Sequence, residues 1–183
     1  KIAGDFNLEG GEFNHGTGAM SISGDIRIAS GSIFNKSTNK SLLTLNGDLT
    51  LENETDTNLG RLQIGSSPDT ITLSGNLITD ELIINDGDIL ITDGFNVSSS
   101  GGITINGTLN ASDGAGGAST ITLSGAWLNN DGTFTSGNST VVFDSTQEQR
   151  IFGSNTFYNF KADSNAGQSL LFEAGKTTSI TNE

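Results

Sequence analysis

A short alternating phrase recurs along the chain: apolar, polar, apolar, Ser or Asn, Gly, any residue, apolar. Alternation with a period of two is typical of a strand with one buried face, so each copy predicts a short β-strand. The phrase begins at Met20, Leu43, Ile71, Ile103 and Ile121, and a frayed copy begins at Ile2. The steps between its glycines are 20, 23, 28, 32 and 18 residues, for Gly4, Gly24, Gly47, Gly75, Gly107 and Gly125.

A strand phrase that returns at irregular steps near twenty residues predicts a coiled β-solenoid. We expect an all-β fold, a right-handed parallel β-helix with coils of about twenty residues and with loops of variable length at one corner. A β-sandwich also has short strands and frequent turns, but it does not explain why the glycine keeps its place in the phrase. We expect one solenoid domain over residues 1–183. Within it we expect a weaker internal division between coils with the glycine phrase, 1–125, and aromatic-rich coils, 126–183.

The alternation also predicts which side chains point inward. Glycine at an inward place leaves a gap in the packing, so we expect the chain to turn a corner or form a bulge there. The Ser or Asn before each glycine predicts a ladder of hydrogen-bonding side chains along the axis. The predicted core residues are Ile71, Leu73, Ile103, Ile105, Ile121, Leu123, Trp127 and Phe143.

Composition and charge exclude several partners. Eight basic residues against 21 acidic ones give a net charge of −13, and no basic run is present, which argues against binding nucleic acid or an anionic membrane. No apolar run approaches the ~20 residues that span a bilayer. Cysteine is absent, and a secreted protein without disulfides is commonly a large bacterial surface protein. We therefore expect an extracellular or cell-surface location.

The aromatic-rich part carries a more specific pattern. It contains, in order, N-x-G-x-F at 130–134, S-T-V-x-F at 139–143 and Q-x-I-x-G-x-x-x-F-x-N at 149–159. These motifs follow one another as in a repeat of very large bacterial extracellular and adhesin-type proteins, which 127–180 resembles. Phe160 stands where that repeat usually has Leu. The resemblance implies a right-handed parallel β-helix with a structural or adhesive role and no known catalysis.

Acidic turns are the strongest candidates for a ligand site. Oxygen ligands on tight turns suit calcium, and the candidate residues are Asp86, Asp88, Asp93 and Asp131, although Asp-Gly is also an ordinary turn dipeptide. The single histidine, His15, has no cysteine or second histidine with which to hold zinc, so we expect an ordinary loop residue. Asn-x-Ser/Thr sequons occur about as often as this composition gives by chance, so glycosylation stays unassigned.

We expect a non-catalytic structural or adhesive module of a secreted bacterial surface protein, with no cofactor unless calcium binds. One alternative is an extracellular filament subunit that stacks end to end, because uncapped solenoid ends invite strand pairing. The partner at the ends would be another copy or neighbouring coils of a longer chain, and a surface glycan or host ligand is a further candidate. The other alternative is a carbohydrate-active β-helix fragment, but no basic residue occurs between Gln63 and Gln149 to neutralise a uronate.

Overall fold

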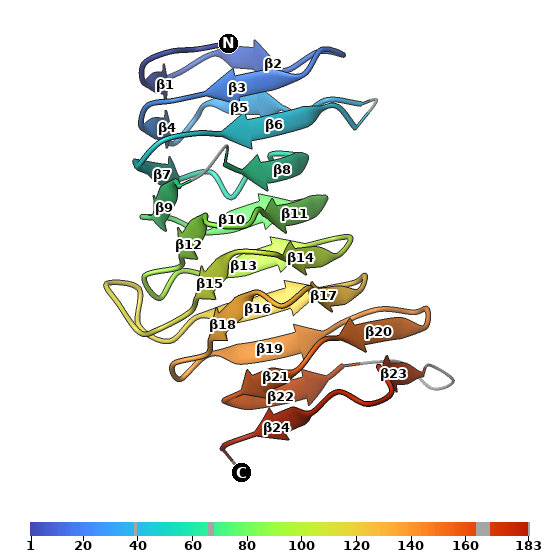
Figure 1. The fold of residues 1–183 in the computed structure, drawn as a ribbon. Helices are drawn as coiled ribbons and strands as arrows, with labels where there is room; N and C mark the ends of the chain where they lie inside the picture. The colour runs from blue at the N-terminus through green and yellow to red at the C-terminus, as the bar shows by residue number, and fades with distance from the viewer. Residues whose placement is uncertain (39, 66–67, 164–168, 183) are drawn as a thin grey trace.

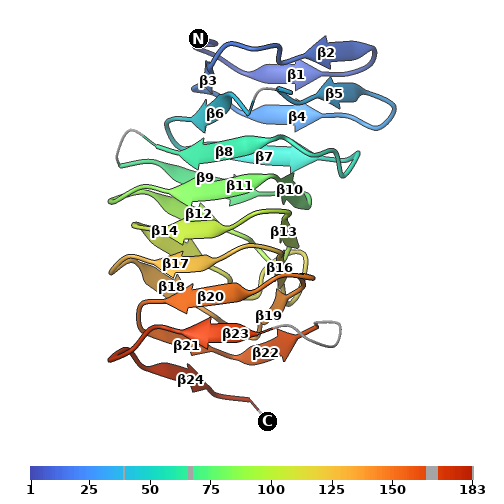
Figure 2. The ribbon, with the colours of Figure 1, turned by 90° about the vertical axis from the view of Figure 1, so that its right-hand side faces the viewer.

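The computed structural model describes residues 1–38, 40–65, 68–163 and 169–182. Across these ranges the chain is all-β and winds as a parallel β-solenoid of about 8 turns, with stacked strands about 21 residues apart (Figure 1). The expected fold is confirmed. The winding is right-handed in Figures 1 and 2, the sense that parallel crossovers favour. The described residues contain no helix that could cross a membrane.

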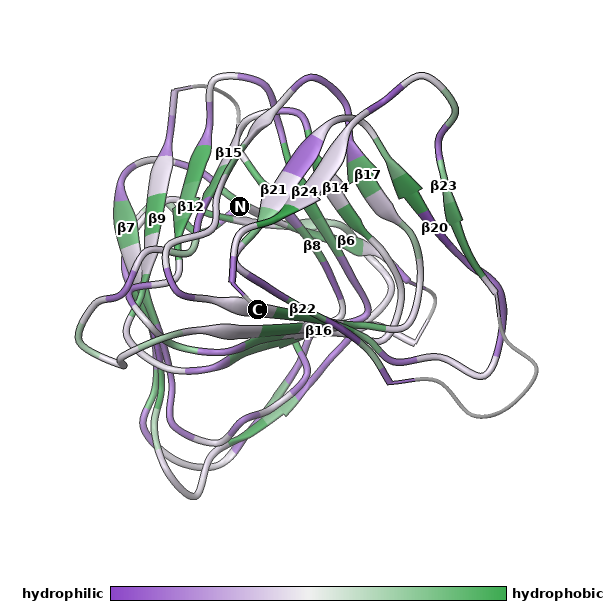
Figure 3. Cartoon of the chain, turned by 90° about the horizontal axis from the view of Figure 1, so that it is seen from below, coloured by the Kyte–Doolittle hydropathy of each residue, from purple (hydrophilic) through white to green (hydrophobic). Residues whose placement is uncertain are grey.

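Seen along its axis, the solenoid has three sides, which we call faces A, B and C (Figure 3). Face A is a continuous eight-stranded parallel sheet that runs almost the length of the molecule. Its strands, in axial order, are β3 (Met20–Ile22), β6 (Leu42–Leu45), β8 (Arg61–Ile64), β11 (Glu81–Ile84), β14 (Ile103–Ile105), β17 (Trp127–Asn129), β20 (Gln149–Phe152) and β23 (Leu170–Phe172).

Face B is a seven-stranded sheet, followed along the axis by one separate strand pair. The sheet consists of β1 (Phe6–Leu8), β4 (Ile26–Ile28), β7 (Leu49–Asn53), β9 (Thr70–Leu73), β12 (Ile89–Ile91), β15 (Thr108–Asn110) and β18 (Thr133–Thr135). The pair that follows is β21 (Asn155–Phe157) with β24 (Thr178–Ile180).

Face C is interrupted. Its first two strands, β2 (Glu12–Asn14) and β5 (Ile33–Asn35), pair only with each other. In the third coil this face holds a single bridge, Asn58 to Ile78, in place of a described strand. A five-stranded sheet then continues with β10 (Leu77–Thr79), β13 (Val97–Ser99), β16 (Thr120–Leu123), β19 (Thr140–Phe143) and β22 (Asn159–Ala162).

The recurring phrase marks corners of the solenoid, and all three corners use it. Gly24, Gly47 and Gly107 lie between a face A strand and a face B strand, Gly75 lies between β9 and β10, and Gly125 lies between β16 and β17. Steps of 20 and 23 residues therefore span whole coils, whereas 28, 32 and 18 span fractional numbers of coils. The prediction that loops at one corner explain the irregular steps is therefore wrong. The steps are irregular because the phrase occurs at all three corners.

Close stacking of the backbone explains most of these glycines. A Cβ at Gly24 would lie 2.6 Å from the Asp5 nitrogen of the coil before it. Only Gly47 among the described phrase glycines has a left-handed backbone, with φ of 84°, so the expected need for backbone freedom holds there. At Gly24, Gly75, Gly107 and Gly125 the absence of a Cβ lets one coil approach the next at hydrogen-bonding distance.

One apolar cluster fills the solenoid from end to end. All eight residues that the alternation placed in the core are at most 1% exposed. Near the C-terminal end the cluster becomes aromatic, with Trp127 edge-on to Phe134 and Phe157 at centroid distances of 4.9 and 5.3 Å. A second aromatic group, Phe6, Phe13 and Phe34, lies at the N-terminal end and was not expected from the sequence.

Replacing an inward side chain should cost far more stability than replacing an outward one on a neighbouring strand. Phe143 is 1% exposed, whereas Thr122 lies half-buried on the outer side of β16. Phe143→Ala should lower the free energy of unfolding by about 3–5 kcal/mol through lost burial and a cavity. Thr122→Ala should lower it by less than about 1 kcal/mol. Denaturant unfolding measures both, and equal losses would contradict the strand register.

Candidate functional site: a polar groove on face C

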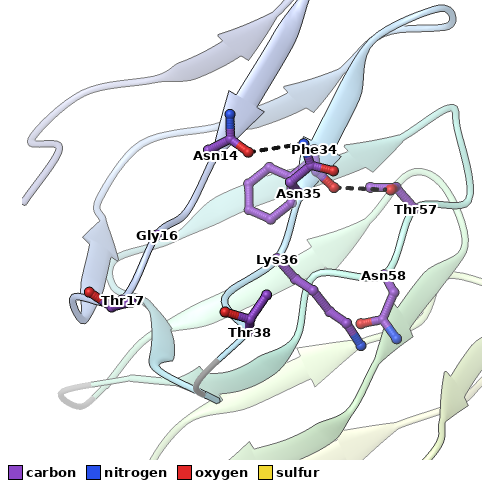
Figure 4. A pocket seen from close by; sticks show the side chains of 9 residues that line it. All are labelled: Asn14, Gly16, Thr17, Phe34, Asn35, Lys36, Thr38, Thr57 and Asn58. Carbon is purple, nitrogen blue, oxygen red and sulfur yellow. Dashed lines mark hydrogen bonds between the residues drawn. The ribbon is translucent and has the colours of Figure 1, made fainter.

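The interruption of face C leaves a groove on the surface. Its volume is about 580 Å³, and it opens to solvent beside β2 and β5 (Figure 4). The third coil does not pair with β5 as a strand there. Among the described hydrogen bonds, the one that connects Phe34 with the third coil is long: its carbonyl accepts from the Thr57 hydroxyl at 3.4 Å. The groove therefore occupies the place where a regular strand would complete the face.

The lining combines amides and hydroxyls with one ammonium group and one ring. Phe34 is buried, with its ring packed against those of Phe6 and Phe13, and Gly16 adds no side chain. The lining residues are Asn14, Gly16, Thr17, Phe34, Asn35, Lys36, Thr38, Thr57 and Asn58. They come from β2, β5 and the segments that follow them, and from the third coil, so three successive coils build the site.

The amide side chains are held by bonds between coils. Asn35 Nδ2 donates to Asn14 Oδ1 at 3.0 Å and to Glu12 Oε1 at 2.6 Å. Asn14 Nδ2 donates to the same Glu12 oxygen at 3.2 Å. Asn58 accepts from the Gly60 amide at 2.7 Å. These bonds fix the orientation of the amides in advance, which lowers the entropy cost of binding a ligand.

The one cation of the lining is neutralised. Lys36 reaches over two coils and forms an ion pair with Asp80, to which Asn58 Nδ2 also donates at 3.0 Å. Burial raises the pKa of Asp80, but the bonds from Lys36 and Asn58, with the Lys36 charge, outweigh it. The pKa of Asp80 therefore lies below its ordinary value, and the groove carries a charge pair with no net charge.

His15 lies directly after β2, between two lining residues, but points inward. It is 8% exposed, its ring is 6.5 Å from that of Phe34, and neither ring nitrogen has a hydrogen-bond partner among the described residues. His15 lies in the loop after β2, as expected, but its burial was not predicted. The alternation of Phe13 and His15 along the strand was the signal for burial.

The four acids proposed for calcium lie in three turns, with Asp86 and Asp88 in the same one. Asp86 and Asp131 are exposed, and both Asp93 and Asp131 have a left-handed backbone typical of turns. Asp131 lies 3.8 Å from the ammonium of Lys176. Among the described residues no three His, Cys, Asp or Glu side chains group closely enough to hold a metal.

Asp88 differs from the other three because it is fully buried. Its Oδ1 accepts the Asp69 amide at 3.0 Å, and its carboxylate lies against Gly65, where a Cβ would collide with it. Gly65 has φ of 94°, so the turn needs glycine for both conformation and space. These contacts are those of a buried carboxylate that caps the chain one coil earlier.

The structure also reveals side chains that connect successive coils and that the sequence interpretation missed. The residue after the phrase glycine accepts the backbone amide one coil further on: Asp25 Oδ1 accepts from Thr50 at 2.7 Å, and Asp48 Oδ1 from Thr70 at 2.9 Å. Asn76 does the same for Asn96 at 3.0 Å. The signal was present, since Asp or Asn fills that place in four of the six phrases. Among the described hydrogen bonds, none joins two of the residues expected to form a ladder before the glycines: Asn106 accepts from Asn130 at 3.0 Å instead, and Asn46 donates to Ser21 at 2.7 Å.

Comparison with protein-family models, with curated proteins and with solved structures finds no match to this chain.

Removing the Asp80 charge should weaken the fold in a pH-dependent way. A carboxyl whose folded pKa is depressed adds stability at pH values above its unfolded pKa, about 3.9, and loses that contribution as pH falls through the folded value. The difference in free energy of unfolding between the wild type and Asp80→Asn should therefore shrink on acidification. Asp163→Asn, which breaks an exposed pair with Lys161, is the control with little effect. A difference for Asp80→Asn that is independent of pH would contradict the assignment.

Asp88 offers a direct test between a capping and a metal-binding role. Asp88→Ala should lower the free energy of unfolding by about 2 kcal/mol, because it removes the acceptor of the buried Asp69 backbone amide. The loss should be equal with calcium and with chelator, and Asp86→Ala, at an exposed position of the same turn, should have little effect. A loss seen only when calcium is present would instead identify Asp88 as a calcium ligand.

Proposed function

We propose that this chain is a non-catalytic structural module of a secreted bacterial surface protein, a stiff spacer that also carries an adhesive surface. The observation that carries the proposal is the continuous axial ladder. Face A runs through eight strands without a break, and one core lies behind it. In a solenoid each coil contacts only its neighbours, so the chain resists bending through the same bonds that stack it.

The dimensions suit a spacer. About 8 turns at roughly 4.8 Å each give a rod of ~38 Å, and its long axis is evident in Figure 1. The net charge of −13 favours a soluble, mutually repelling surface. The resemblance of 127–180 to repeats of very large bacterial extracellular and adhesin-type proteins supports a place on the cell surface.

A second candidate function is end-to-end assembly into a filament. The last strands expose large apolar side chains: Leu171 is 43% exposed, Phe172 52% and Ile180 53%. Their backbone edges can pair with a further strand, and head-to-tail association, in which one end of a chain meets the opposite end of the next copy, is open and forms fibres. This candidate differs from the first in needing a second copy of the chain.

Solution scattering and electron microscopy distinguish the two candidates. As a spacer, the purified chain should remain a monomeric rod at increasing concentration, and immunogold labelling should place the parent protein on the outside of intact cells. As a filament subunit, it should form fibres that the substitution Phe172→Lys prevents. A compact, intracellular monomer would contradict both proposals.

A further inference from the structure

The groove on face C has the chemistry of a site for a neutral sugar chain. Three amide side chains, Asn14, Asn35 and Asn58, and three hydroxyls, Thr17, Thr38 and Thr57, surround it. Amides and hydroxyls both donate and accept, as the hydroxyl groups of a sugar do. We infer that the groove binds a neutral oligosaccharide and is the adhesive surface of the module. This inference rests on the proposed function.

The electrostatics favour a neutral ligand over an anionic one. Lys36 is the one charged residue of the lining, and Asp80 already pairs with it. Glu12 lies at the edge of the amide network, and the whole chain carries a net charge of −13. A phosphate or uronate would meet no unpaired cation among the lining residues and would enter a negative field.

The groove retains hydrogen-bonding capacity after its internal bonds are formed. Asn35 uses Nδ2 for Asn14 and Glu12, and no described group donates to its Oδ1. Asn58 uses one hydrogen of Nδ2 for Asp80, which leaves a second donor. Thr38 is exposed at the rim. The amides are thus held in place by the protein and present further atoms to a ligand.

Size and shape agree with a short sugar chain. A volume of about 580 Å³ lies within the ~300–1,000 Å³ typical of small-molecule sites. The groove opens to solvent. An extended peptide fits less well, because strand addition needs a row of free backbone groups, whereas β5 has three residues and its Phe34 carbonyl already accepts from the Thr57 hydroxyl.

Nuclear magnetic resonance titration of the intact chain tests the inference. The probes are cellotetraose, maltotetraose and N-acetylchitotetraose, with tetragalacturonate as an anionic probe and tetra-alanine as a peptide probe. At least one neutral probe should shift amide signals confined to residues 14–17, 34–38 and 57–58. Binding only of tetragalacturonate, only of the peptide, or of none of the probes overturns the inference.

A blocked groove supplies the matched control. Thr38→Trp fills the rim of the groove, whereas Thr135→Trp adds the same bulk at an exposed threonine of face B. Thr38→Trp should weaken binding of the neutral probe by about tenfold or more, and Thr135→Trp should leave it within about twofold. Both should melt like the wild type. Equal weakening by both variants, or by neither, overturns the site. Such a failure leaves the spacer proposal standing, since scattering and immunogold labelling test it separately.

Discussion

Hydrogen bonding between successive coils is the constraint on which the rest of this molecule depends. Strands stack in register only if the corners also approach to backbone distance, and a Cβ at Gly24 would prevent that approach. Once the corners are close, the short side chains of Asp25 and Asp48 reach the amides of the next coil. The corner phrase therefore combines three functions: an apolar anchor in the core, a glycine for proximity and an acceptor for the neighbouring coil.

The groove arises where this constraint is relaxed. In the third coil, face C keeps one bridge at Asn58, and the edge of β5 has no described strand beside it. Side chains take over from the backbone there: amides connect Asn14 with Asn35, and Lys36 reaches Asp80 two coils away. The local loss of strand pairing thus replaces a flat sheet surface with a groove lined by polar groups. Faces A and B keep the coils aligned.

The sequence predicted the architecture well because strand alternation and glycine spacing are local properties. Ile71 and Ile103 could be assigned to the core from their neighbours alone, and both are fully buried. The choice of corner could not be predicted, since Gly75 and Gly125 both end the local sequence Thr-Ile-Thr-Leu-Ser-Gly although they lie at different corners. The groove could not be predicted either. It brings together Asn14, Asn35 and Asn58, whose proximity depends on the lengths of two full coils.

The interchangeability of the three corners has a consequence for how such a chain can change length. Whole-coil insertions lengthen the rod and leave every later surface facing the same way. An insertion of one strand with its corner would instead rotate all later coils by a third of a turn about the axis, because the same phrase closes any corner. The groove, confined to the first three coils, would then point in a different direction from the surfaces beyond it, with the core and the axial ladder preserved.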